Sequence, residues 1–261
     1  MTEVNPRQEL WEERAGMYDF SFEERQEDAQ FYMRLAKEYG SPVLEGGCAT
    51  GRILLPMARE GITVHGVDFS EAMLERFRQK LESEPDDVRR RTHLYKADLL
   101  EPVPIDDSFS LIFLAFGTLG TFIHDGEAER VLRNLSPKLA PHGRLVIERR
   151  NRLSDNYCTC RRFDWARYWP ERRAAVTQSQ TSVILDESRH IREQAFYYDV
   201  VDESGNVTKA IHRIYFREFT LLDMQCMLER AGLRVEKVYG DYRSNPFDPG
   251  MPRVIVVAER A

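Results

Sequence analysis

Apolar and polar positions along the first 150 residues predict helices and short buried strands in alternation. Within residues 22–39, apolar side chains recur at roughly helical spacing until Gly40 ends the run. Further helices are expected over residues 52–59, from the N-capping Ser70, and over 126–139. The expected strands cover residues 42–45, 62–67, 92–97, 110–115 and 144–148. The apolar positions of the first helix are Ala29, Phe31, Tyr32, Leu35 and Ala36.

The pattern changes after about residue 150. Four segments rich in Tyr, Phe, Val, Ile and Thr show partial alternation and are separated by turn signals. They cover residues 158–168, 177–185, 191–201 and 207–219. A helix at 221–231 and strands at 233–239 and 253–258 then restore the earlier pattern. Alternating strands and helices imply a parallel sheet covered on both faces, into which antiparallel strands are inserted.

Length and composition fit a folded protein with one large domain or one domain with an insertion. The chain has 261 residues, of which 42% are hydrophobic and 31% charged. Its net charge of −6 argues against broad nucleic-acid binding. No stretch approaches the ~18 apolar residues that cross a bilayer, and the polar N-terminus resembles no secretory signal. We expect a cytoplasmic protein with neither a nucleic-acid nor a membrane partner.

The cysteines do not predict a structural metal site. Cys48, Cys158, Cys160 and Cys226 are too few and too irregularly spaced for a disulfide framework or a four-ligand zinc site. The Cys158-Thr-Cys160 segment would place two thiols on one face of a strand, which leaves a soft-metal or arsenic site as an alternative. The main interpretation is a reduced protein with no metal.

The segment Val43-Leu-Glu-Gly-Gly-Cys-Ala-Thr-Gly-Arg52 carries the clearest chemical signal. A glycine turn after a buried strand lets backbone approach a ligand closely. The helix start that follows presents free N–H groups and the positive end of the helix dipole. Asp68 ends the second strand, 21 residues after Gly47, where a carboxylate can accept both ribose hydroxyls of an adenosine-containing cofactor.

Two positions argue against a nicotinamide dinucleotide as that cofactor. A dinucleotide fingerprint that began at Gly46 would need glycine at position 48, which is Cys48. Glu45 would also lie unfavourably beside a pyrophosphate, whereas it suits an ammonium group. A nicotinamide oxidoreductase is therefore the least favoured alternative.

The sequence resembles the class I S-adenosylmethionine-dependent methyltransferases of the small-molecule branch, which include sugar and amine N-methyltransferases. The resemblance covers most of the chain. It departs from the family at Ala49, which replaces the middle glycine of the first motif, and at Gly46, where the family generally has a bulky apolar residue. The four matching segments are residues 45–52, 67–73, 97–99 and 107–116.

The resemblance implies S-adenosylmethionine as cofactor and S-adenosylhomocysteine as product. It implies that Glu45 orders the glycine loop or meets the cofactor's amino group, that Asp68 holds the ribose, and that Asp98 accepts from the adenine amino group. Gly47 and Gly51 are expected close to the methionine part. The full expected set is Tyr18, Glu45, Gly47, Ala49, Gly51, Arg52, Asp68, Phe69, Met73, Ala97, Asp98, Leu99 and Phe116.

Each assignment has a structural alternative. Glu45 could merely cap backbone amides, the glycines could serve helix–strand packing, and Asp68 could cap a helix. Asp98 could lie in a surface turn. Phe69 and Met73 are expected to flank the adenine, although a methionine on a helix is commonly a core residue.

Two residues are candidates for catalysis. Residues 1–40 resemble the helical cap of related enzymes, and Tyr18 within it is the candidate beside the reactive methyl, because an aromatic face or a phenol oxygen stabilises a sulfonium. His124 is a candidate base for an acceptor that must lose a proton. Plain packing and a structural histidine are the respective alternatives. Methyl transfer is an in-line displacement, so positioning and water exclusion can supply most of the acceleration.

Residues 149–173 contain eight arginines and three acidic residues, interleaved with Trp165, Tyr168 and Trp169. They could shape a pocket for an anionic or aromatic acceptor, or form a solvated basic strand face. The family often uses such a layer for dimer contacts, so a homodimer through the insertion is expected.

The combined prediction is an α/β fold with a doubly wound, Rossmann-like seven-stranded sheet, an antiparallel β insertion that acts as a lid, and an N-terminal helical cap. The predicted function is methyl transfer to N, O or C of a small molecule. A cyclase or lyase that acts on the cofactor itself, and a non-catalytic partner-binding subunit, are the alternatives. The expected parts are the cap (1–40), the core (41–150), the insertion (151–219) and the rest of the core (220–261).

Overall fold

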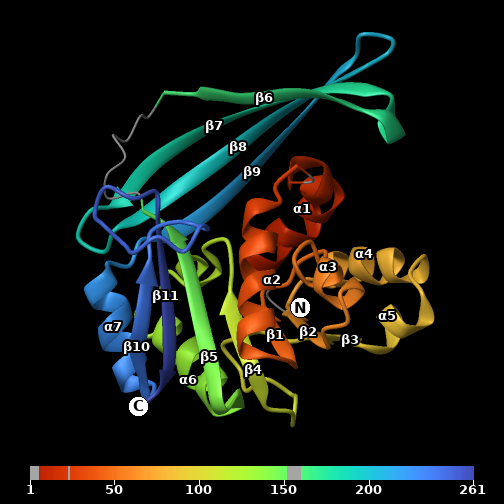
Figure 1. The fold of residues 1–261 in the computed structure, drawn as a ribbon. Helices are drawn as coiled ribbons and strands as arrows, with labels where there is room; N and C mark the ends of the chain where they lie inside the picture. The colour runs from red at the N-terminus through yellow and green to blue at the C-terminus, as the bar shows by residue number, and fades with distance from the viewer. Residues whose placement is uncertain (1–5, 23, 152–159) are drawn as a thin grey trace, which may run out of the picture. The chain divides into compact units, whose positions relative to one another are not determined.

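The computed structural model describes residues 6–22, 24–151 and 160–261, which divide into two compact units (Figure 1). The core unit comprises Met1–Ser154 and Phe219–Ala261, and the inserted unit comprises Asp155–Glu218. Among the described residues, no helix is long and apolar enough to span a membrane.

The core unit is built on a seven-stranded sheet with the order β10-β11-β5-β4-β1-β2-β3 (Figure 1). Strands β1 to β5 pair in parallel, whereas β11 runs antiparallel to both β5 and β10. The strand order reverses between β1 and β4, and open α/β sheets bind ligands at the carboxyl ends of the strands at such a switch point. The strands are β1 (Val43–Gly46), β2 (Val64–Asp68), β3 (Thr92–Lys96), β4 (Phe109–Leu114), β5 (Leu139–Arg150), β10 (Leu233–Tyr239) and β11 (Arg253–Arg260).

Helices cover both faces of this sheet because its central strands are apolar on both sides. Val43 packs in a cluster with α2 and α3, while its neighbour Leu44 packs in a second cluster with α6 and α7. This alternation follows from the two-residue period of a strand. The helices are α1 (Pro6–Phe22), α2 (Glu27–Tyr39), α3 (Leu54–Arg59), α4 (Glu71–Glu82), α5 (Asp86–Arg90), α6 (Glu127–Leu135) and α7 (Leu221–Arg230), with the 3₁₀ turns η1 (Thr118–Thr121) and η2 (Ser136–Lys138).

The inserted unit is a four-stranded antiparallel sheet with the order β6-β7-β8-β9. Its strands are β6 (Arg162–Trp169), β7 (Ala174–Asp186), β8 (Ile191–Asp202) and β9 (Val207–Arg217), and η3 (Pro170–Arg172) joins the first two. The predicted fold class, a doubly wound seven-stranded sheet with an antiparallel insertion, is confirmed.

Several expected boundaries differ from the structure. The helix expected over 22–39 begins at Glu27, because Phe22 ends the preceding helix α1. The strand expected over 144–148 extends across Leu139–Arg150, since it pairs with β4 on one side and β11 on the other. The short helix α5 was not expected.

The soft-metal alternative depends on a segment that the structure describes only in part. Cys158 lies outside the described residues, and Cys160 is exposed. No group of three or more His, Cys, Asp or Glu side chains that could hold a metal ion occurs within the described ranges.

Gly51 at the end of the glycine turn has a positive φ of 77°, and a Cβ built there would lie 2.3 Å from the ring of Phe77 in α4. Gly61 also has a positive φ, 89°, but no heavy atom of the described residues outside its immediate neighbours lies within 4 Å of a Cβ built there. Gly51→Ala combines left-handed strain with overpacking against a rigid ring and should cost about 3 kcal/mol of unfolding free energy. Gly61→Ala carries the strain alone and should cost about 1 kcal/mol. Urea denaturation measures both, and equal losses would contradict the packing argument.

Candidate functional site

The turn that follows β1 is held against the end of β2 by backbone hydrogen bonds. The N–H of Gly47 donates to the carbonyl oxygen of Val67 over 2.7 Å, and the N–H of Ala49 donates to Oδ2 of Asp68 over 2.8 Å. Ala49 has φ 47°, a left-handed conformation that glycine adopts more readily. The Asp68 carboxylate therefore helps to hold Ala49 in this left-handed conformation.

Asp68 bonds to a second segment as well. Its Oδ1 accepts the N–H of Ser70 over 2.9 Å, and the hydroxyl of Ser70 in turn accepts the N–H of Met73 and caps α4. A carboxylate has about four lone-pair sites, so these two bonds are compatible with further acceptance from ribose hydroxyls. The N-cap of α4 is Ser70, so Asp68 does not itself cap this helix, and the ribose role stays a prediction.

Glu45 at the end of β1 is a buried carboxyl, with 4% of its surface exposed. Burial raises its pKa well above the ordinary value, the charges of Asp28 and Asp68 add to the rise, and the charge of Arg52 opposes it. Its Oε2 has no hydrogen-bond partner within the part of the chain that the structure describes. A buried acceptor without a partner is costly, so Glu45 fits a ligand group that carries N–H donors and positive charge.

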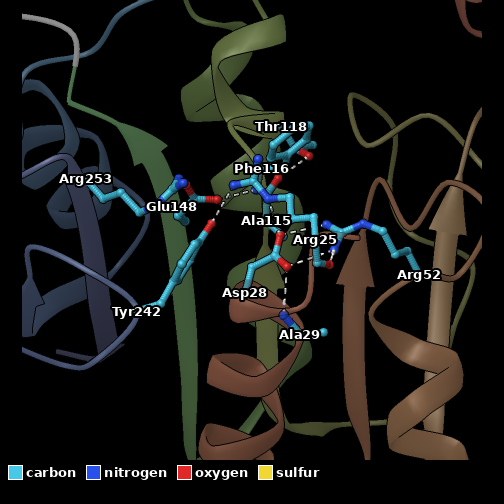
Figure 2. A network of polar contacts seen from close by, with 10 residues as sticks. All are labelled: Arg25, Asp28, Ala29, Arg52, Ala115, Phe116, Thr118, Glu148, Tyr242 and Arg253. Atoms are coloured by element: carbon cyan, nitrogen blue, oxygen red, sulfur yellow. Dashed lines mark hydrogen bonds and ion pairs between the residues drawn. The ribbon is translucent and has the colours of Figure 1, made fainter. Parts of the chain in front are cut away.

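Arg52 fastens the end of the glycine turn to α2 (Figure 2). Its two terminal nitrogens donate to the two carboxylate oxygens of Asp28 over 2.8 and 2.7 Å. Its Nε is buried with no partner among the described residues. Together, Arg52 Nε as donor and Glu45 Oε2 as acceptor suit the carboxylate and ammonium of an amino acid, which is one end of S-adenosylmethionine.

Asp28 is fully buried and is bonded to two arginines, Arg52 and Arg25. Burial alone would raise its pKa, but the hydrogen bonds and charges of the two guanidinium groups outweigh burial and hold the pKa below its ordinary value. The sequence analysis did not single out Asp28, because an acid in the first turn of a helix is common for other reasons.

The loop after β4 is held in an unusual conformation by Glu148 (Figure 2). Phe116 has φ 56°, and its N–H donates to Oε2 of Glu148 over 2.5 Å. The other carboxylate oxygen of Glu148, which is buried at the end of β5, accepts from Arg253 over 2.6 Å. The guanidinium of Arg25 lies 4.2 Å from the centroid of the Phe116 ring. Glu148 of β5 and Arg25, which lies just before α2, thus both contact Phe116.

Helix α1 packs on the glycine turn. Tyr18 is buried and forms a small apolar cluster with Ala15, Ala49 and Met73. Burial raises the pKa of the Tyr18 phenol, with the charge of Arg52 opposing the rise. The structure therefore brings together three of the expected site residues, Tyr18, Ala49 and Met73.

Asp19 connects the same helix to the turn. Its Oδ1 accepts one hydrogen bond from the hydroxyl of Thr50 over 2.5 Å and another from the ammonium of Lys80 over 2.6 Å. Lys80 also donates to the carbonyl oxygen of Thr50 over 2.9 Å. These bonds join α1, the glycine turn and α4.

The residues expected around the adenine differ from one another in burial. Asp98 accepts the N–H of Leu100 over 3.1 Å in the turn after β3, and Phe69 and Ala97 are half-buried. Leu99 is buried in the core. A Cβ at Gly46 would lie 3.0 Å from Leu99 and 2.7 Å from Leu114, which explains the glycine at position 46.

His124 differs from the other expected residues. It lies between η1 and α6 with an exposed side chain, and its backbone N–H donates to the carboxylate of Glu127 over 3.2 Å. Tyr18, Glu45 and Asp68 are all buried.

Comparisons with known proteins identify what the core unit is similar to. Residues 43–143 match the family model of the methyltransferase domain. Over 129 residues the chain is 28% identical to carboxy-S-adenosyl-L-methionine synthase of Sulfurimonas denitrificans, a match that covers 48% of this chain and 52% of that protein. The aligned part thus spans about half the length of that curated relative.

Solved structures share the fold over nearly the whole chain. The CcbJ methyltransferase of Streptomyces caelestis superposes with a TM-score of 0.73 at 23% identity, and covers 90% of both chains. The sugar N-methyltransferase KedS8 of a Streptoalloteichus species gives a TM-score of 0.73 at 19% identity, with 94% of this chain and 93% of that chain covered. Residues 43–143 therefore match the methyltransferase domain, and the chain as a whole shares the fold of these solved methyltransferases.

Proposed function

We propose that this chain transfers the methyl group of S-adenosylmethionine to a nitrogen, oxygen or carbon atom of a small-molecule acceptor and releases S-adenosylhomocysteine. The observation that carries the proposal is the buried carboxyl of Glu45 beside the glycine turn, whose Oε2 has no hydrogen-bond partner in the described residues. The methyltransferase domain at residues 43–143 supports it.

The residues that would hold the cofactor lie along the carboxyl ends of β1, β2 and β3. Glu45 and Arg52 suit its amino-acid end, and Asp68 suits the ribose. The residues proposed to contact the adenine are Phe69, Met73, Ala97, Asp98 and Leu99. When bound, the cofactor supplies an electrophilic methyl group on a sulfonium.

Tyr18 contributes as a neutral phenol, because burial raises its pKa. It therefore offers a ring face and an oxygen lone pair rather than a negative charge, and its packing on Ala49 and Met73 excludes water from the turn. His124 stays the candidate base for an acceptor that must lose a proton, and its exposed side chain can pass that proton to solvent.

Nitrogen is the acceptor atom to test first, because KedS8, which shares this fold, is a sugar N-methyltransferase. A neutral amine has a free lone pair, so it needs no base before the transfer. A cyclase or lyase that acts on the cofactor, and a silent partner-binding subunit, are less favoured. Product analysis without any acceptor separates the first of these from methyl transfer.

We also propose that the acceptor is anionic or aromatic and that the inserted unit acts as its lid. The arginines and aromatic residues of the segment 149–173 support this proposal. Within the inserted unit, Arg161 pairs with Asp199 and Arg173 with Glu203. The guanidinium groups of Arg167 and Arg172 lie over tryptophan rings at 4.3 and 4.5 Å. Arg152 and Asp155, which belong to the same basic segment, lie outside the described residues. A cytoplasmic location is proposed on the same basis of sequence alone.

We also propose that the chain forms a homodimer through the inserted sheet. Strand register places two rows of side chains on one face of that sheet, each crossing all four strands. Phe163, Tyr168, Val207 and Ile211 in these rows are each more than half exposed, and apolar side chains gathered in this way are typical of protein interfaces. The rows are Phe163, Ser179, Tyr197 and Ile211, and Tyr168, Ala175, Val201 and Val207.

Calorimetric titration with S-adenosylhomocysteine tests the proposed cofactor site, with NADH as the control ligand. Asp68→Asn removes a charge that would hold the ribose and should weaken binding at least ~10-fold. Asp107→Asn, which changes an exposed carboxylate before β4, should leave the affinity unchanged. Absence of binding by the unmodified chain would contradict the proposed function.

Cofactor binding should release a proton from Glu45. Because burial raises its pKa, the carboxyl keeps its proton to a higher pH than a free glutamate does. An ammonium group stabilises the ionised form, so binding expels the proton and affinity rises with pH as long as the unliganded carboxyl is protonated. Titrations in phosphate and in Tris should give different apparent enthalpies. Glu45→Gln should abolish that difference, and equal enthalpies for the unmodified chain would refute the linkage.

Light scattering coupled to size-exclusion chromatography tests the dimer. The unmodified chain should elute with twice its own mass, and the double variant Phe163→Asp, Ile211→Asp should elute as a monomer because two charges per copy would be buried. Leu222→Asp alters a side chain that is 67% exposed on α7 in the core unit and should remain dimeric. A monomeric unmodified chain at micromolar concentration would rule the interface out.

A further inference from the structure

The hydroxyl of Tyr32 is a buried polar group that the proposed function does not use. Tyr32 lies in α2 with 0% of its surface exposed. Its Oη has no hydrogen-bond partner among the residues that the structure describes. A hydroxyl in that state gives up its hydration without compensation, so a phenylalanine would be the better residue for packing alone.

Strand register places this side chain over the switch point. The ring of Tyr32 stacks on the ring of Phe113 in β4, with centroids 4.3 Å apart and planes 19° apart. Phe113 pairs with Glu45 in β1. Residues paired in this way project their side chains to the same face of a sheet. Tyr32 therefore covers the face from which Glu45 projects.

Glu148 projects from that face as well. Phe113 also pairs with Val146 in β5. Glu148 follows Val146 by two residues, so its side chain projects to the same face as those of Val146 and Phe113. Figure 2 shows Glu148 at this end of the sheet with Arg253 and Phe116, which occupy its two carboxylate oxygens. Glu148 is thus already satisfied, whereas Oε2 of Glu45 has no partner within the described ranges.

The electrostatic surroundings keep Tyr32 neutral. Burial raises the pKa of its phenol well above the ordinary value, and the charges of Glu148, Asp28 and Glu45 raise it further. The hydroxyl therefore has both a proton and acceptor lone pairs. Asp28 and Glu148 are already bonded to arginines, whereas Oε2 of Glu45 has no partner among the described residues, so a ligand group with several N–H donors could bond to Glu45 and to this hydroxyl.

We propose that the hydroxyl of Tyr32 accepts a hydrogen bond from the ammonium group of the cofactor's methionine part, beside the carboxylate of Glu45. An ammonium has three N–H donors, so acceptors on α2 and on β1 fix its position from two directions. The inference rests on the proposed function, because it needs S-adenosylmethionine at this edge of the sheet.

Tyr32→Phe removes only the hydroxyl and tests the inference by calorimetry. The two ligands are S-adenosylhomocysteine and its desamino analogue, which has hydrogen in place of the amino group, titrated directly or by displacement. The variant should bind S-adenosylhomocysteine about tenfold more weakly, which corresponds to about 1.4 kcal/mol. Its affinity for the desamino analogue should match that of the unmodified chain. The melting temperature without ligand should be unchanged or higher, since a costly buried hydroxyl is removed.

Tyr39→Phe is the matched control, since it removes a hydroxyl from the last turn of the same helix, where Lys237 donates to it. This variant should bind both ligands normally. Equal weakening of both ligands by Tyr32→Phe, or a lower melting temperature, would show a structural role and overturn the inference. Unchanged affinity for S-adenosylhomocysteine would overturn it too, and would indicate that water satisfies the hydroxyl. Failure of the unmodified chain to bind S-adenosylhomocysteine would instead contradict the proposed function.

Discussion

The buried carboxylate of Asp28 holds together the segments from which the site is built. Two guanidinium groups surround it, one from the end of the glycine turn and one from the segment just before α2. One of these, on Arg25, also lies over the ring of Phe116 in the loop after β4. Loss of the carboxylate would leave two cations facing each other in a region of low dielectric, and removal of one partner from a buried ion pair is strongly destabilising. The turn after β1 and the loop after β4 are therefore not independent of each other.

A second ion pair extends this arrangement across the sheet. Glu148 joins β5 to β11 through Arg253, and it holds the backbone of Phe116 in a left-handed conformation. The ring that Arg25 covers thus belongs to the residue whose backbone Glu148 fixes. Two charged clusters meet at one aromatic side chain, on the edge of the sheet where the strand order reverses.

The sequence predicted those parts of the molecule whose signals are local. Hydrophobic periodicity indicated the strands and the insertion, and the spacing from the glycine turn to Asp68 depends only on the length of one strand–helix–strand unit. Asp28 and Arg253 escaped prediction because their partners lie 24 and 105 residues away along the chain. Tyr32 was read only as an apolar position of a helix, since its hydroxyl adds nothing to the pattern. Ala49 was recognised as a departure, but its left-handed backbone and its bond to Asp68 depend on the tertiary structure.

Gly46 has a consequence for how sequences related to this chain can diverge. Leu99 and Leu114 occupy the space into which a side chain at position 46 would project. The three positions form one packing unit, so a relative with a bulky residue at the first would need smaller or displaced residues at the other two. A single exchange at any one of them would create either a clash or a cavity. Substitutions at these three sites should therefore have been acquired together, and their combined volume should vary less among homologues than the volume at any one site.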